Sequence, residues 1–109
     1  MITDEEITAI FSLYAKHGWN LRRVLLSQQL KNQLSAETHG LAEIYDSEIN
    51  AAWFSRASEN GGEAWELRLL NQNPYALVEI FDAEDEEEVR EEARKEIEDR
   101  IHKQFARGN

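Results

Sequence analysis

Residues 52–68 read AWFSRASENGGEAWELR, in which two similar segments, AWFSR and AWELR, flank a turn that contains two glycines. Alternating apolar and polar residues on both sides of such a turn are typical of a β-hairpin. Residues 75–81 read YALVEIF and follow a second turn sequence at residues 71–74. The sequence therefore predicts three consecutive antiparallel strands between Ile49 and Phe81.

The lengths of the two loops set the register of these strands. A three-residue first loop, residues 60–62, places Trp53 and Trp65 on the same face of the predicted sheet. We assign this face to the core beneath the helices, because it collects apolar side chains from all three strands. A four-residue second loop adds three residues of the last strand to the same core face: Ala76, Val78 and Ile80.

The opposite face of the predicted sheet is also partly apolar, although an antiparallel sheet with one solvated face usually alternates more cleanly. Large exposed apolar patches are uncommon on monomers, so either the chain itself or another protein covers this face. We predict a protein–protein interface here, and a homodimer is the simplest case because most soluble oligomers are symmetric. The predicted interface consists of Phe54, Leu70, Tyr75, Leu77 and Phe81.

Helical signals precede the predicted strands. Thr3 and Glu6 have the spacing of a capping box at the start of a first helix, and Gly18 is suited to end it. A second helix is predicted over Leu21–Leu34, because its apolar residues cover a wide helical arc. We therefore expect residues 1–35 to form a helical hairpin with the outline of a helix-turn-helix.

The remaining segments complete a single α+β domain over residues 1–109. Residues 41–45 predict a short strand or, alternatively, a helical turn. Together with residues 49–82 they give an antiparallel sheet of three or four strands. Residues 84–106 predict a long acidic helix, with acids at its start and bases at its end, as the helix dipole favours. Its apolar stripe has one residue per turn: Val89, Ala93, Ile97, Ile101 and Phe105.

The composition excludes several kinds of protein. The chain contains no cysteine, which rules out disulfides and thiolate chemistry. Its hydrophobic fraction of 41% is sufficient for a folded core. The first ten residues are acidic, unlike a signal peptide, and no apolar run is long enough to cross a bilayer. We predict a cytoplasmic protein that does not contact a membrane.

No catalytic, metal-binding or cofactor-binding motif is present in the sequence. The three histidines lie far apart, and the acidic run at residues 82–88 lacks the spacing of a calcium loop. Glu66 and Glu79 have arginines nearby in the predicted sheet, which favours ion pairs over an acid/base pair. We predict no cofactor, no metal and no enzymatic activity, and a small-molecule enzyme is the third functional alternative.

One basic region interrupts the acidic sequence. The chain carries a net charge of −10 at pH 7, yet no acidic residue lies between Glu6 and Glu37. An aromatic ring that can stack and a helix N-terminus suggest an anion or nucleic-acid site made of Lys16, Trp19, Arg22 and Arg23. Alternatively, Trp19 packs at the helix corner and the arginines pair with acids of the C-terminal helix. Weak binding of nucleic acid or phosphate is thus the second functional prediction, after non-catalytic protein association.

Overall fold

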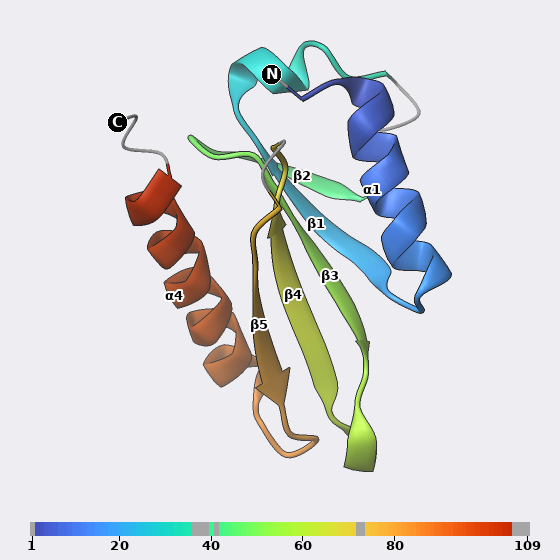
Figure 1. Cartoon of the computed structure of the whole chain (residues 1–109). Coiled ribbons are helices and arrows are strands. Elements are labelled where there is room, and N and C mark those ends of the chain that lie inside the picture. Colours follow the sequence, from blue (N-terminus) through green and yellow to red (C-terminus); the bar gives the residue numbers. More distant parts are fainter. Residues whose placement is uncertain (1, 36–39, 41, 72–73, 106–109) are drawn as a thin grey trace.

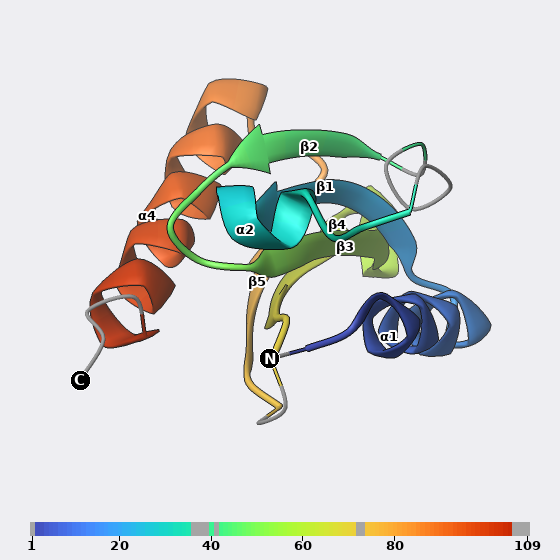
Figure 2. The ribbon, with the colours of Figure 1, turned by 90° about the horizontal axis from the view of Figure 1, so that it is seen from above.

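The computed structural model describes residues 2–35, 40, 42–71 and 74–105. Within them, a five-stranded mixed sheet has α1 on one face and α4 on the other (Figures 1 and 2). The predicted α+β class and long C-terminal helix are therefore confirmed. The elements in chain order are α1 Asp4–Lys16, β1 Asn20–Leu26, α2 Gln28–Lys31, β2 Glu43–Asp46, β3 Ala51–Ala57, the 3-10 turn η1 Glu59–Gly61, β4 Glu63–Leu69, β5 Ala76–Phe81 and α4 Glu87–Phe105.

The strands follow the order β2-β1-β3-β4-β5 across the sheet. The predicted meander β3-β4-β5 is antiparallel, and β1 joins it antiparallel to β3. β2 pairs with β1 in parallel, so the strand alternative predicted for residues 41–45 is correct for the part that the structure describes. The sheet is therefore larger than predicted, and one of its pairings is parallel.

The predicted second helix, Leu21–Leu34, is wrong. Its first half is the inner strand β1, and Ser27 then caps the short α2 by accepting a hydrogen bond from the Leu30 N–H. Val24, Leu25 and Leu26 are all buried, with Leu25 on one face of the sheet and its neighbours on the other. A strand that is covered on both faces reads as a continuous apolar run, which resembles a buried helix in the sequence.

The first helix has the predicted ends. The Thr3 hydroxyl accepts a hydrogen bond from the Glu6 N–H at 3.1 Å, and the Glu6 carboxylate accepts one from the Thr3 N–H at 2.9 Å. These two bonds form the capping box. Gly18 follows the helix with a φ of +86°, a left-handed conformation that favours glycine. The helix packs on the sheet through the buried side chains of Ile7 and Phe11.

Two hydrophobic clusters fill the two sides of the sheet. The buried residues of the α1 cluster are Ile2, Ile7, Phe11, Val24, Leu26, Leu30, Leu34, Ala52, Phe54 and Leu70. Those of the α4 cluster are Leu25, Ile49, Ala51, Trp53, Trp65, Leu67, Leu69, Phe81, Ile97 and Ile101, with Tyr75, Leu77 and Ala93 packed against them.

Trp53 and Trp65 point to the same side of the sheet, as predicted. Their ring centroids lie 6.0 Å apart, and the two residues are only 0% and 4% exposed. The first loop is longer than predicted, because the last pair before it is Ala57 with Glu63. The observed loop, residues 58–62, is longer than the predicted loop, residues 60–62, by an even number of residues. Every side chain of the hairpin therefore lies on its predicted face.

The predicted register of β5 is wrong by one residue, because Leu67 pairs with Leu77 and not with Val78. The cause lies at Leu70, just before the second loop. Its N–H donates to the Asn50 carbonyl at 2.7 Å, and its side chain is buried in the α1 cluster. Leu70 thus leaves the pairing with β5, and the second connection is one residue longer than predicted.

This shift moves every side chain of β5 to the face opposite to the predicted one. Leu77 and Phe81 pack beneath α4. Val78 and Ile80, which we predicted in the core together with Ala76, are 50% and 56% exposed. The last strand therefore presents its β-branched residues to solvent.

The buried side of α4 is also rotated from the prediction. Ile97 and Ile101 are buried as predicted, but Val89 and Phe105 are 54% and 38% exposed. Arg94 occupies the interface instead, at 1% exposure, with its guanidinium carbon 4.3 Å from the centroid of the Trp65 ring. A charged residue thus takes a central place in the contact between α4 and the sheet.

Candidate functional site

The two helices cover the two faces of the sheet unequally (Figure 2). α1 packs over β1 and β3, where Phe11 lies 5.9 Å from Phe54 and Tyr14 stacks on the same ring at 3.9 Å. On the α1 side, the residues of β5 stay exposed. We call the exposed residues Ala76, Val78 and Ile80 the β5 strip. This part of the sheet has no cover among the described residues.

The backbone of β5 is also open on its outer edge. The Leu69 N–H donates to the Tyr75 carbonyl at 2.8 Å, so these two residues form a hydrogen-bonded pair. Because such pairs recur at every second residue of an antiparallel ladder, the N–H and C=O groups of residues 77, 79 and 81 also point toward β4. The N–H and C=O groups of the β5 strip therefore point away from β4. No strand among the described residues pairs with them.

Edge strands are usually guarded by lysine, proline or a bulge. β5 has none of these, and its only charged residue, Glu79, lies in the same phase as Leu77 on the α4 side. The β5 strip thus combines exposed apolar side chains with unpaired backbone groups, which is the pattern of a strand that pairs with another chain.

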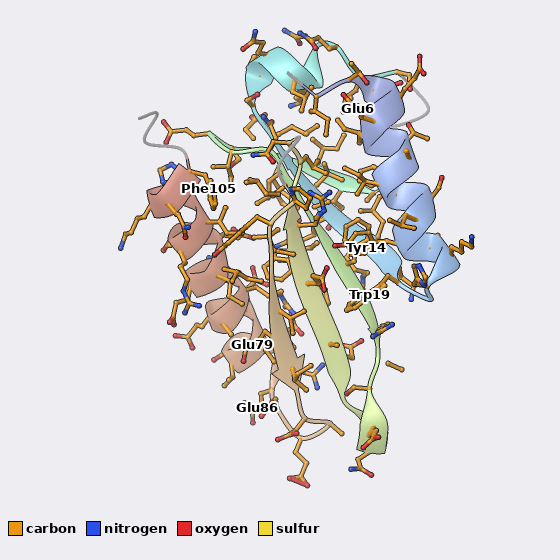
Figure 3. All side chains as sticks on the ribbon, viewed as in Figure 1. Glu6, Tyr14, Trp19, Glu79, Glu86 and Phe105 are labelled. Carbon is orange, nitrogen blue, oxygen red and sulfur yellow. The ribbon has the colours of Figure 1, made fainter. Side chains whose placement is uncertain are left out.

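A concave site lies beside the β5 strip, between α1 and the sheet, and we call it the α1 groove. Its volume is about 550 Å³, and its lining residues are Leu13, Tyr14, His17, Trp19, Arg56, Glu66, Arg68 and Pro74. Tyr14 and Trp19 lie side by side at the end of α1, with ring centroids 6.1 Å apart (Figure 3). The groove therefore has an aromatic wall and a charged floor.

Hydrogen bonds fix the polar groups of the α1 groove. The Tyr14 hydroxyl donates to the Glu66 carboxylate, and burial, together with this bond, raises the pKa of Tyr14 well above its ordinary value. The Arg56 guanidinium lies 4.3 Å from the Trp19 centroid and donates to the His17 carbonyl at 3.2 Å. Arg68 donates to the Leu69 carbonyl. The side chains of Tyr14, Arg56 and Arg68 are thus fixed in the groove by hydrogen bonds.

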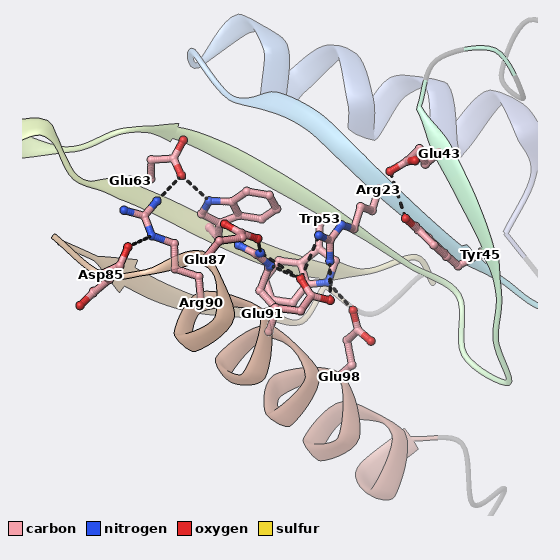
Figure 4. Close-up of polar contacts among 12 residues, drawn as sticks. Arg23, Glu43, Tyr45, Trp53, Glu63, Asp85, Glu87, Arg90, Glu91 and Glu98 are labelled. Atoms are coloured by element: carbon pink, nitrogen blue, oxygen red, sulfur yellow. Dashed lines mark hydrogen bonds and ion pairs between the residues drawn. The ribbon is translucent and has the colours of Figure 1, made fainter. Parts of the chain in front are cut away.

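A second polar region lies beneath α4 (Figure 4). Arg23 binds Glu91 through two hydrogen bonds of 3.0 and 3.3 Å, and Arg94 donates to the same carboxylate at 2.9 and 3.1 Å. Burial acts to raise the pKa of Glu91, but the hydrogen bonds from the two arginines outweigh it and lower that pKa. Trp53 Nε1 donates to Glu98 at 2.7 Å. These contacts attach α4 to the sheet.

The cavity next to this region has a volume of about 310 Å³ and opens between α4 and the β1–β2 side of the sheet. Among its lining residues, Arg23 forms an ion pair with Glu91, and Asp46 forms one with Lys31. Arg94 Nη1 is buried and has no hydrogen-bond partner among the described residues, but its neighbours are the carboxylates of α4 and the Trp65 ring. The arrangement is that of an ion-paired helix contact.

The five residues of the predicted interface do not share a surface. Phe54 and Leu70 are buried in the α1 cluster, whereas Phe81 is buried in the α4 cluster, against which Tyr75 and Leu77 also pack. The one-residue shift of β5 separates the two groups. The chain itself buries Phe54, Leu70 and Phe81 and partly buries Tyr75 and Leu77.

The four residues of the predicted anion site are not brought together either. Trp19 lines the α1 groove, and Lys16 ends α1. Arg22 and Arg23 lie on the α4 side, 4.9 and 5.8 Å from the Trp65 centroid. A bulge between Leu21 and Arg23 puts both arginines on that side. Arg23 pairs with an acid of the C-terminal helix, which is the arrangement of the alternative prediction.

The sequence prediction missed the residues that form the open side of the sheet. The α1 groove combines Tyr14 of α1 with Arg56, Glu66 and Arg68 of the β3–β4 hairpin, two parts of the chain that lie far apart in the sequence. One usable signal was present, because the segment 75–81 has neither the proline nor the lysine expected at an edge strand.

Within the described ranges, no group of three or more histidine, aspartate or glutamate side chains is placed to hold a metal ion. None of the helices in those ranges is long and apolar enough to span a bilayer. Comparison of the chain with protein-family models, with curated proteins and with solved structures finds no match in any of the three.

Proposed function

We propose that this protein is a non-catalytic association module that forms a homodimer through the outer edge and open face of β5. The observation that carries the proposal is the β5 strip, where 50–56% exposed Val78 and Ile80 coincide with backbone groups that point away from β4. Burial of these side chains supplies a driving force, and the edge supplies hydrogen bonds.

A second copy fits this edge because β5 is complementary to itself. Antiparallel pairing about a twofold axis at Val78 sets Val78 opposite Val78 and Ala76 opposite Ile80. All of these residues have outward backbone groups, so each pair exchanges both hydrogen bonds. Their side chains also lie on one face, so the two β5 strips merge into one apolar surface between the two copies of α1.

The charges on α4 agree with this arrangement. Glu91 and Glu98 face β1 and β3, so the opposite flank of the helix faces the free edge of β5. Along this flank the exposed residues change from Glu92 and Glu96 to Arg100 and Lys103. Two antiparallel copies of α4 about the same axis bring the acidic half of one beside the basic half of the other.

Sedimentation velocity over a range of concentrations tests the proposal. The wild-type protein is expected to dimerise with a Kd of about micromolar order, since a strand-pair interface is small. Val78→Asp and Val78→Lys each place like charges opposite each other at the twofold axis, and we expect each to weaken the dimer at least about tenfold. A mixture of the two variants should restore dimers, because opposite charges then face each other.

Tyr45→Asp is the matched control, since Tyr45 is 42% exposed but lies on β2, at the opposite edge of the sheet from β5. This variant should dimerise like the wild type. A wild-type protein that stays monomeric at about 100 micromolar contradicts the proposal. So does a dimer that Tyr45→Asp disrupts and the Val78 variants leave intact.

A further inference from the structure

Within the described part of the chain, neither of the two arginines that line the α1 groove forms a direct ion pair with a carboxylate. Among the described residues, Arg23, Arg90, Arg94 and Arg100 all form ion pairs with glutamates. Arg56 and Arg68 have only carbonyl oxygens, the Trp19 ring and the Tyr14–Glu66 pair near their guanidinium groups. In a chain with 22 acidic residues, two such cations on one concave surface are unexpected.

We propose that the α1 groove binds a small organic monocarboxylate with an aromatic or branched apolar body. The volume of about 550 Å³ suits such a ligand, since ligand pockets usually have between about 300 and 1,000 Å³. Leu13, Tyr14, Trp19 and Pro74 provide apolar contact area for the body of the ligand. The guanidinium groups provide the charge complement of a carboxylate.

The two arginines are held in place before a ligand arrives. Trp19 lies against the Arg56 guanidinium at 4.3 Å, and the His17 carbonyl accepts one of its hydrogen bonds. A guanidinium has five N–H donors, so most of the donors of Arg56 remain available. Arg68 stands on the neighbouring strand and on the same face of the sheet, where it donates to the Leu69 carbonyl.

Glu66 restricts the charge of the ligand. Its carboxylate lies on the floor of the same groove and accepts the hydrogen bond from the Tyr14 hydroxyl. Two arginines and one glutamate leave a local charge of one positive unit, which balances a monoanion and disfavours a dianion such as phosphate. The apolar wall further favours an acid with a hydrophobic body over acetate.

Titration followed by NMR tests the proposal with 3-phenylpropionate as the probe. We expect saturable shifts of the Trp19 indole N–H and the Arg56 Nε–H, complete at or below about 10 mM. The neutral 3-phenylpropionamide should bind at least about tenfold more weakly, because it lacks the charge that the arginines recognise. Acetate and inorganic phosphate should cause no saturable shift at the same concentrations.

Variants distinguish binding in the α1 groove from a general affinity of the protein for anions. Arg56→Gln and Arg68→Gln should each weaken the binding of 3-phenylpropionate at least about tenfold. Arg22→Gln is the matched control, since Arg22 also lacks a carboxylate partner in the described part of the chain but lies on the α4 side. This variant should bind like the wild type.

The proposal is overturned if 3-phenylpropionate gives no saturable shift. It is also overturned if the amide binds equally well, or if Arg22→Gln weakens binding as much as the two groove variants do. The titration is repeated with Val78→Asp, which keeps all the groove residues. Unchanged binding there shows that the ligand site stands independently of the proposed dimer, and a loss of binding contradicts a site within one chain.

Discussion

α4 closes its side of the sheet over β3, β4 and β5, whereas α1 leaves β5 exposed on the other side. α4 is attached by two buried tryptophans, a buried arginine and ion pairs, so it follows the sheet as far as β5. α1 is attached by aromatic contacts over β1 and β3 and leaves the β5 strip exposed. An apolar strand of this sheet is therefore buried only on a face that a helix covers.

Substitutions in the α4 cluster should lower the free energy of unfolding most. Trp53→Ala removes a fully buried ring from the α4 cluster and leaves a cavity, so we expect unfolding to become easier by about 3–5 kcal/mol. Leu13→Ala, on the open side, should change the free energy of unfolding by less than about 0.5 kcal/mol. Urea denaturation measures the free energy of unfolding of both variants. Similar losses of stability in the two would show that the α4 side is not packed more tightly than the α1 side.

The next effect concerns the arginine that attaches α4. Arg94→Ala should cost about 2–3 kcal/mol, because the side chain packs on Trp65 and is 1% exposed. Arg94→Met keeps most of this packing and removes the buried Nη1 that has no partner, so we expect it to lie within about 1 kcal/mol of the wild type. Equal losses for alanine and methionine would show that the charge, and not the packing, attaches the helix.

A smaller effect is expected on the α1 side. Tyr14→Phe removes the hydrogen bond to Glu66 but keeps the stacking on Phe54, so the loss of stability should be about 1 kcal/mol. The raised pKa of Tyr14 gives a second measurement. Its stabilising contribution is present below the ordinary tyrosine pKa of 10.0 and is lost as the pH rises above it. Tyr14→Phe should therefore flatten the pH dependence in that range, and an unchanged alkaline profile would argue against the bond.

The smallest expected effect is the acid sensitivity of the α4 contact. The pKa of Glu91 is lowered in the folded protein, so its contribution is present above the ordinary value of 4.5 and is lost as the pH falls below it. Glu91→Gln should reduce the slope of stability against pH in this acidic range and leave it unchanged near pH 10. The effect stays small because the Glu91 side chain is 36% exposed and solvent screens its charge. A steeper slope in the variant would contradict the assignment.

Local signals in the sequence predicted the parts of the fold that depend on neighbouring residues. The capping box at Thr3, the left-handed Gly18 and the shared face of Trp53 and Trp65 follow from short-range chemistry. They are therefore correct even though the first loop is longer than expected.

Long-range contacts decided the parts that the sequence did not reveal. Leu21–Leu34 reads as a helix, because burial on both faces of the sheet hides the alternation of β1. The register of β5 accompanies the departure of Leu70 from the strand pairing, where its N–H donates to the Asn50 carbonyl and its side chain is buried, and no local pattern indicates these contacts. The exposure of the β5 strip results from this register, and the α1 groove requires the packing of α1 on the β3–β4 hairpin, so neither site was predictable from local sequence.

Amide hydrogen exchange at Val78 and Ile80 tests most directly whether β5 pairs with a second copy. Their N–H groups point away from β4, so nothing in the described chain protects them. We predict that they exchange slowly at high protein concentration and quickly on dilution below the dimer Kd, while the Leu77 N–H stays protected throughout. Rapid exchange of Val78 and Ile80 at every concentration would mean that the edge of β5 remains free.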